Sequence, residues 1–139
     1  MRTTRLDLLL CGALQSAALF LAAPCGVAGQ APLATYETAQ AEAGAEAYQA
    51  HCAACHMADL GGGVEGPPLA GEYFASMWGG RPVTELLTFV RNNMPLRRPR
   101  SLDEETTLAL IAYLLARNGA PAADAPLAAG SEGVIAPAR

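Results

Sequence analysis

The residues Cys52-Ala53-Ala54-Cys55-His56 place two thiols and one imidazole close together in the chain. On a helix, side chains three and four residues apart project from one face within about one turn. Two thiols at this spacing can form thioether bonds to neighbouring vinyl groups of a haem while the imidazole reaches the iron. A C-x-x-C-H run is typical of c-type haem attachment. We therefore predict one covalently bound haem c, with thioethers at Cys52 and Cys55 and His56 as the proximal axial ligand of the iron.

The cysteine pair has three other interpretations: a redox dithiol, a structural disulfide or half of a zinc site. A thioredoxin-like dithiol follows a strand in a βαβ unit, whereas residues 40–50 are rich in Ala and Glu, which favour a helix. A structural zinc site needs four ligands. Outside the motif the only cysteines and histidine are Cys11, Cys25 and His51. These observations favour haem.

Residues 1–31 have the features of a secretory signal peptide, which predicts cleavage and export to the periplasm. Arg2 and Arg5 precede an apolar stretch over residues 8–23, and small residues follow it. The stretch is short for a membrane span, which needs about 20 apolar residues, although an uncleaved anchor is the alternative. Lipidation at Cys25 is disfavoured by the preceding Pro24. Without this segment, the motif holds the only cysteines, so no other thiol competes with it in an oxidising compartment.

About 110 residues remain, which is the size of one domain. Apolar periodicity and capping signals predict an all-α fold, and no β pattern is present. Residues 59–71 are rich in Gly and Pro, which predicts a loop. Ser101 with Glu104 is typical of a capping box. Residues 120–139 lack periodicity, so we expect a flexible tail after a domain at 32–119. The expected helices are Thr38–Cys55, one or two turns near Tyr73–Trp78, Pro82 to about Asn92, and Leu102–Arg117.

The iron needs a second axial ligand, and we predict Met94. His51 is about 140° round the helix from His56, so it does not reach the opposite face of the haem. Met57 adjoins His56 on the same side, and Met77 is interpreted as core filling. Met94 follows a whole helix, in a proline-rich segment that must be extended, and it can return across the distal face.

Ligation by His56 and Met94 closes both axial positions of the iron. A Met ligand raises the reduction potential relative to nitrogen ligation, and no position stays open for oxygen or peroxide. The expected function is therefore one-electron transfer and not enzymatic catalysis. The alternative is a haem enzyme or gas-sensing module with a labile sixth ligand. A phosphate-binding glycine loop is disfavoured because Gly61–Gly63 lacks the flanking strand and helix.

The segment from Gly44 to Gly119 resembles the class I c-type cytochromes, which are mono-haem and ligated by His and Met. Gly44, Tyr48 and the cysteine motif match the spacing of the family's N-terminal helix, and residues 110–114 match its C-terminal helix. The resemblance implies a small cytochrome c fold in which these two helices cross, with short helices and loops around one haem.

The resemblance also implies roles for individual residues. The carbonyl of Pro67 is the expected acceptor of a hydrogen bond from the His56 imidazole, which would orient the ring and tune its basicity. Residues 93–95 resemble the loop that carries the sixth ligand. By analogy, Trp78 or Arg81 contacts a haem propionate, a point that the sequence leaves open.

Charge is unevenly distributed along this chain of net charge −4. Six acidic residues and no Arg or Lys lie between residues 30 and 78, and the chain has no lysine at all. Arg91, Arg97, Arg98 and Arg100 surround Met94 in the sequence, and we call them the arginine collar.

This collar would steer an acidic redox partner, with a dehydrogenase as donor and an oxidase or other cytochrome as acceptor. The protein would act free or as the cytochrome subunit of such a system. The alternative is a set of solvated side chains, and nucleic acid is not an expected partner.

Overall fold

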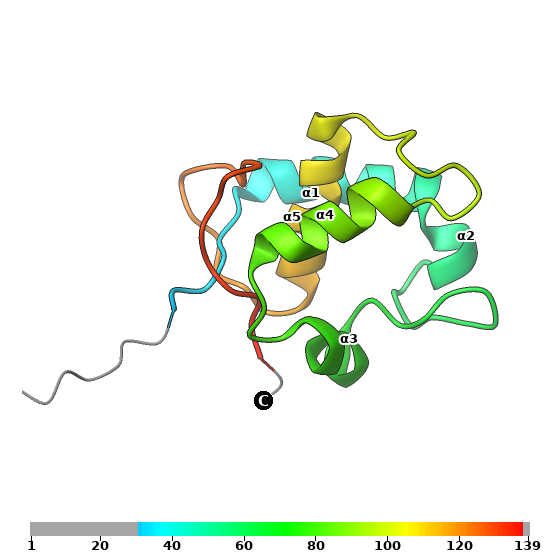
Figure 1. Cartoon of the computed structure of the whole chain (residues 1–139), viewed down its shortest axis with the longest axis horizontal. Coiled ribbons are helices and arrows are strands. Elements are labelled where there is room, and N and C mark those ends of the chain that lie inside the picture. Colours follow the sequence, from blue (N-terminus) through cyan, green and yellow to red (C-terminus); the bar gives the residue numbers. More distant parts are fainter. Residues whose placement is uncertain (1–30, 138–139) are drawn as a thin grey trace, which may run out of the picture.

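The computed structural model describes residues 31–137, so the predicted signal segment lies outside the described residues except for its last residue. The described part is helical, with only isolated β-bridges between extended segments (Figure 1). This confirms the expected all-α class. In chain order the helices are α1 (Thr38–His51), α2 (Ala53–His56), α3 (Gly71–Trp78), α4 (Val83–Asn93) and α5 (Glu104–Arg117).

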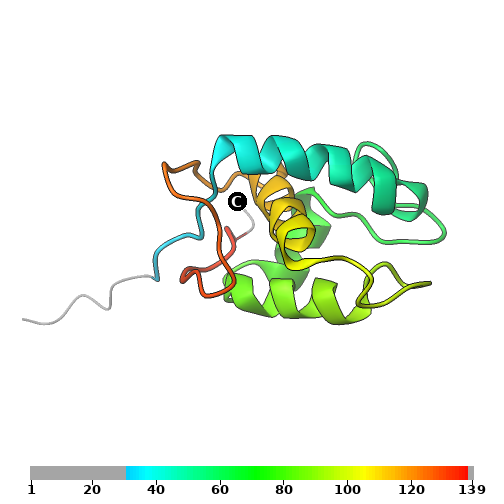
Figure 2. The ribbon, with the colours of Figure 1, turned by 90° about the horizontal axis from the view of Figure 1, so that it is seen from above.

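The first and last long helices cross at close range, as the resemblance implied. Figure 2 shows α5 passing between α1 and α4. Gly44 is buried at the crossing, and a Cβ there would overlap the carbonyl oxygen of Ala109. The rings of Tyr48 and Tyr113 pack beside it with centroids 5.4 Å apart. A glycine inside a helix costs about 1 kcal/mol relative to alanine, and here it permits the close approach of two backbones.

The helix that the sequence predicted over Thr38–Cys55 is interrupted at Cys52. That residue has φ −122° and ψ −37°, and its N–H donates to the carbonyl of Tyr48, ending α1. The carbonyl of Cys52 then accepts from the N–H groups of Cys55 and His56, at 3.1 and 3.0 Å. The cysteine motif therefore begins at a break between two helices and not inside one helix.

The cap of α5 also differs from the predicted capping box. The helix begins at Glu104, and Oδ1 of Asp103 accepts a hydrogen bond from the N–H of Thr106 at 2.7 Å. That hydrogen bond lowers the pKa of the Asp103 carboxyl. Both Ser101 and Asp103 are residue types that cap helices. The sequence therefore allowed the helix to start after either residue, and in the structure it starts after Asp103.

The sequence predicted a flexible tail from residue 120 onward, whereas residues 120–137 pack on the helices and on the N-terminal segment. Leu127 and Ile135 are 3% and 0% exposed. The N–H of Ala123 donates to the carbonyl of Tyr36, and those of Ala34 and Val134 donate to the carbonyls of Val134 and Pro32 (all 2.8–2.9 Å). The buried residues are irregularly spaced, so no periodicity in the sequence reveals them.

The helices of residues 31–137 are all too short or too polar to cross a membrane. The longest, α1 and α5, have 14 residues each, whereas a span needs about 20.

We expect Gly44→Ala to destabilise the protein, because the added methyl would meet the α5 backbone, which cannot rotate away. Overpacking of this kind costs about 1–3 kcal/mol, and denaturant unfolding of the haem-loaded protein would measure it. Glu46→Ala, at an exposed site on the same helix, is the matched control and should change stability by less than about 0.5 kcal/mol. Equal stability of the two variants would contradict the close crossing.

Candidate functional site

The two thiols of the motif lie at the junction of α1 and α2. Both cysteines are free and partly exposed. Burial, and secondarily the charge of Cys55, raises the pKa of the Cys52 thiol to about 11. The Cys52 side chain is therefore protonated near neutral pH. Neither sulfur is committed to a disulfide within the described residues, so both are chemically available for thioether bonds.

The imidazole of His56 is oriented by a backbone carbonyl. His56 is buried, and its Nδ1 lies 2.8 Å from the carbonyl oxygen of Pro67. This is the contact that the resemblance implied. A carbonyl only accepts hydrogen bonds, so Nδ1 must carry the proton. In the neutral ring the lone pair is then on Nε2, the nitrogen that is left to bind a metal ion.

The loop that carries Pro67 approaches the ring so closely that glycine is required at position 66. A Cβ on Gly66 would lie 2.8 Å from Nδ1 and 2.9 Å from Cε1 of His56. Side-chain carbons do not normally approach this closely. The Gly- and Pro-rich composition predicted a loop here, but nothing in the sequence indicated this contact.

The same loop is tied to the end of α5 by Asn118. Its Nδ2 donates to the carbonyl of Leu69 at 3.0 Å, and its Oδ1 accepts from the N–H of Gly71 at 3.0 Å. Leu60 is fully buried, and its carbonyl accepts from the N–H of Leu69 at 2.9 Å. The sequence indicated Asn118 only as a helix stop, because its partners are 47 and 49 residues away.

The hydroxyl of Tyr48 contacts the backbone at the end of the cysteine motif. Its hydroxyl donates to the carbonyl of Met57 at 2.8 Å and lies 3.3 Å from that of His56. Burial is the main cause that raises the pKa of this phenol to about 12, so it stays a neutral donor near neutral pH. The carbonyls of His56 and of the C-cap Met57, at the end of α2, thereby gain a donor from the α1–α5 crossing besides the N–H groups of Gly62 and Leu60.

Met94 immediately follows α4 and has the extended backbone that the sequence predicted, with φ −117° and ψ 151°. Its side chain is half-buried. The interpretation of Met77 as core filling was wrong, because that residue is 49% exposed. Met57 is exposed as well. Among the described methionines, Met94 is thus the least accessible to solvent.

The segment after Met94 reaches the loop after His56. Nη2 of Arg97 lies 3.3 Å from Oε2 of Glu65, and the same carboxylate oxygen lies 3.8 Å from Sγ of Cys55. Figures 1 and 2 both show α2 and the segment after α4 at the same end of the domain. Residues 32 apart in the chain therefore meet here. Nothing in the sequence singled out Glu65 for this position.

The arginines of the predicted collar are all exposed, and some have partners. Nη1 of Arg91 lies 3.5 Å from Oε2 of Glu104. Nε of Arg100 lies 3.3 Å from Oδ1 of Asn92, and Arg98 is exposed beside them. Exposed ion pairs contribute little to stability, about 0–1 kcal/mol. Arg98 and Arg100 have no ion pair within residues 31–137, so their guanidinium groups leave a positive charge at the surface of the segment after Met94.

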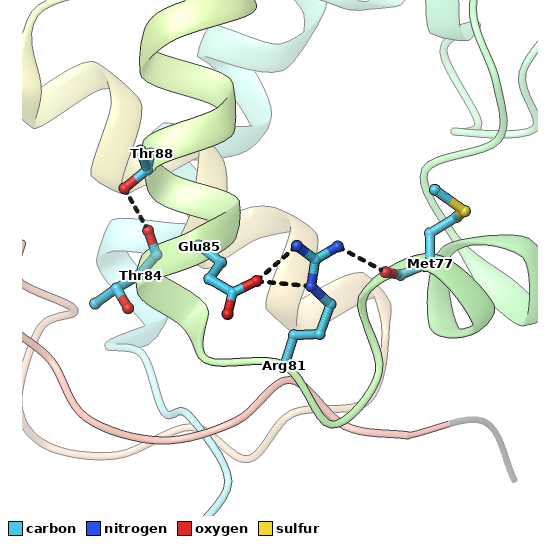
Figure 3. A network of polar contacts seen from close by, with 5 residues as sticks. All are labelled: Met77, Arg81, Thr84, Glu85 and Thr88. Atoms are coloured by element: carbon cyan, nitrogen blue, oxygen red, sulfur yellow. Dashed lines mark hydrogen bonds and ion pairs between the residues drawn. The ribbon is translucent and has the colours of Figure 1, made fainter.

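Arg81, one of the two residues proposed for a propionate, is engaged with its own neighbours (Figure 3). Its Nη2 and Nε lie 2.6 and 2.8 Å from Oε2 of Glu85, and its Nη1 donates to the carbonyl of Met77 at 3.2 Å. Its guanidinium also covers the ring of Trp78, 4.5 Å from the centroid. A propionate contact by Arg81 would have to compete with Glu85, and this role stays a prediction.

The donor set fits a covalently attached haem. It consists of two uncommitted thiols, an imidazole whose tautomer leaves Nε2 free, and a thioether that the chain brings to the same end of the domain. The pair follows a helix, and the described residues contain no βαβ unit of the kind that a thioredoxin-like dithiol requires.

One protein family and one solved structure are similar to parts of this chain. The family model described as "Cytochrome C oxidase, cbb3-type, subunit III" matches residues 39–114. No curated protein matches significantly. One solved structure similar to the chain is the sulfane dehydrogenase SoxCD from Paracoccus pantotrophus, with 24% identity and a TM-score of 0.49. The match covers 56% of this chain and 43% of that one.

We expect Gly66→Ala to displace the imidazole of His56 from the carbonyl of Pro67, because the added methyl would overlap the ring atoms Nδ1 and Cε1 and the carbonyl oxygen of Cys55. Denaturant unfolding should show a loss of about 1–3 kcal/mol, and the absorption spectrum of the haem-loaded protein should shift. Gly61→Ala is the control, since its Cβ would meet only the movable carboxylate of Asp59. If both variants kept the wild-type spectrum and stability, the tight contact at Gly66 would be refuted.

Proposed function

This chain belongs to the cytochrome c family described as cytochrome c oxidase, cbb3-type, subunit III, and from that premise we propose that it is a one-electron carrier. The observation that carries the proposal is the C-x-x-C-H motif, whose His56 ring is oriented by Pro67 at 2.8 Å. A structural dithiol or disulfide needs no imidazole held in one tautomer. An axial ligand of iron does.

In this proposal each residue of the motif has one task. Cys52 and Cys55 would hold one haem c covalently, and His56 would bind its iron through Nε2. The haem would supply an iron centre that gains and loses one electron. The hydrogen bond to Pro67 fixes the ring plane and increases the basicity of the imidazole.

Met94 is the proposed distal ligand. In support, it is half-buried, and the segment after it is joined to the attachment motif through Arg97 and Glu65. Ligation by Met94 would leave no open position on the iron, which favours electron transfer over catalysis. We therefore propose that the protein is not itself an enzyme.

The proposed compartment is the periplasm. Support comes from the signal-like composition of residues 1–31 and from the absence of cysteines other than Cys52 and Cys55 after it. The redox partners would be proteins, with a dehydrogenase as donor and an oxidase or other cytochrome as acceptor. The protein would work either free or as the cytochrome subunit of such a system.

Met94→Ala is expected to open the distal position of the iron. The ferric protein should then lose the thioether–iron absorption band and become high-spin, and its reduction potential should fall. Met77→Ala removes an exposed methionine and should keep both properties. A wild-type spectrum for Met94→Ala would reject this ligand and favour the enzyme or sensor alternative.

The arginines near Met94 are expected to attract an anionic electron acceptor. With ferricyanide as the probe, stopped-flow oxidation of the reduced protein should slow several-fold as ionic strength rises, because salt screens the attraction. The variant Arg97→Gln/Arg98→Gln/Arg100→Gln should react more slowly and depend less on salt. Arg117→Gln is the control, since Arg117 stacks on Tyr113 at the end of α5. A salt-independent wild-type rate would show that the arginines are only solvated side chains.

A further inference from the structure

A groove of about 750 Å³ lies between the first half of α1 and the start of α5. Three alanines of α1 at four-residue spacing form one side of its floor, because residues i, i+4 and i+8 share a helix face. The apolar side chain of Leu108 and the buried Ala109 form the other side. The alanines are Ala39, Ala43 and Ala47.

The packed C-terminal segment supplies the third wall, at Pro126. The amide of Gln40 holds this wall in place, since its Nε2 donates to the carbonyl of Leu127 at 2.9 Å and its Oε1 accepts from the N–H of Leu127 at 2.8 Å. The wall lies outside residues 39–114, the part that the family model matches. The groove is therefore built in part from a segment that this chain adds to the matched domain.

The polar rim of the groove is acidic. Glu37, Glu104 and Glu105 line it, and no arginine does. Glu104 is partly neutralised by Arg91 at 3.5 Å, whereas no ion pair within residues 31–137 involves Glu37 or Glu105. The nearby α1 residues Glu42 and Glu46 are also exposed. An apolar floor with this rim is complementary to apolar side chains flanked by positive charge.

We propose that this groove docks a segment of a partner protein that presents Lys or Arg side chains around one or two apolar ones. Figures 1 and 2 show the start of α1 and the C-terminal segment at the end of the domain away from α2, whereas α5 begins near the middle, directly after the segment that follows α4. A partner held in the groove would leave the end with Met94 and the cysteine motif free. This consequence, but not the binding itself, rests on the proposed function. The groove and the arginines would thus select partners of opposite charge.

The test uses the haem-loaded, ¹⁵N-labelled protein and a synthetic twelve-residue amphipathic peptide of Leu and Lys. Saturable shifts are expected at the amides of Ala43, Ala47 and Leu108, and a peptide with Glu in place of Lys should cause none. Glu37→Gln/Glu105→Gln should weaken binding about fivefold. Each lost charge interaction at the rim should cost about 0.5 kcal/mol of binding free energy, and the two costs add. Ala43→Arg, at an exposed position, should abolish it by placing a cation on the floor.

Glu42→Gln/Glu46→Gln removes the same charge from the same helix outside the groove and should weaken binding less than the rim variant. Equal weakening by both, shifts spread over the whole acidic surface, or binding of the Glu peptide would overturn the proposal. Shifts at the groove that grow with protein concentration alone would assign it to a second copy of this chain. Because no readout here depends on the distal ligand, failure leaves the Met94 spectrum as a separate test of the carrier function.

Discussion

The contact between α1 and α5 at Gly44 is the constraint on which the site depends. No side chain separates the two backbones there, since a Cβ would overlap the carbonyl of Ala109. The close crossing places Tyr48 against Tyr113, and from this buried position its hydroxyl reaches the last carbonyls of α2. A helix of only four residues is too short to be stable alone. It is therefore held by the crossing, and with it the orientation of the cysteine motif.

A second constraint acts through the loop between α2 and α3. Buried Leu60 and the two hydrogen bonds of Asn118 hold the loop from both sides. Held in this way, the loop presents the carbonyl of Pro67 to His56, and glycine at position 66 allows the approach. The imidazole tautomer thus follows from packing that begins at the far end of α5. Charge is also unevenly distributed, because Arg98 and Arg100 follow Met94 with no ion pair within residues 31–137, and the groove residues Glu37 and Glu105 have none there either.

Several features could be predicted from the sequence because they depend on neighbours within one or two turns. Periodicity located the long helices to within a few residues, and the two prolines indicated the extended backbone at Met94. The errors arose where two local solutions compete. Ser101 and Asp103 are both good caps, and only packing selects the second. Cys52 suits a helix interior, yet the chain breaks there. Leu127 and Ile135 are buried at spacings that match no secondary structure, so the sequence predicted a flexible tail.

The sequence by itself determined the chemistry of the site, because the order Cys-x-x-Cys-His is a local arrangement of two thiols and an imidazole that needs no tertiary information to recognise. It also determined the helical class. Only the tertiary structure decided which partners these groups have. The carboxylate of Glu65 beside Cys55 and Arg97, the amide of Asn118 on the loop, and the acidic groove closed by residues 120–137 join segments tens of residues apart. Such contacts follow from how the helices pack, and a pattern along the chain does not contain that geometry.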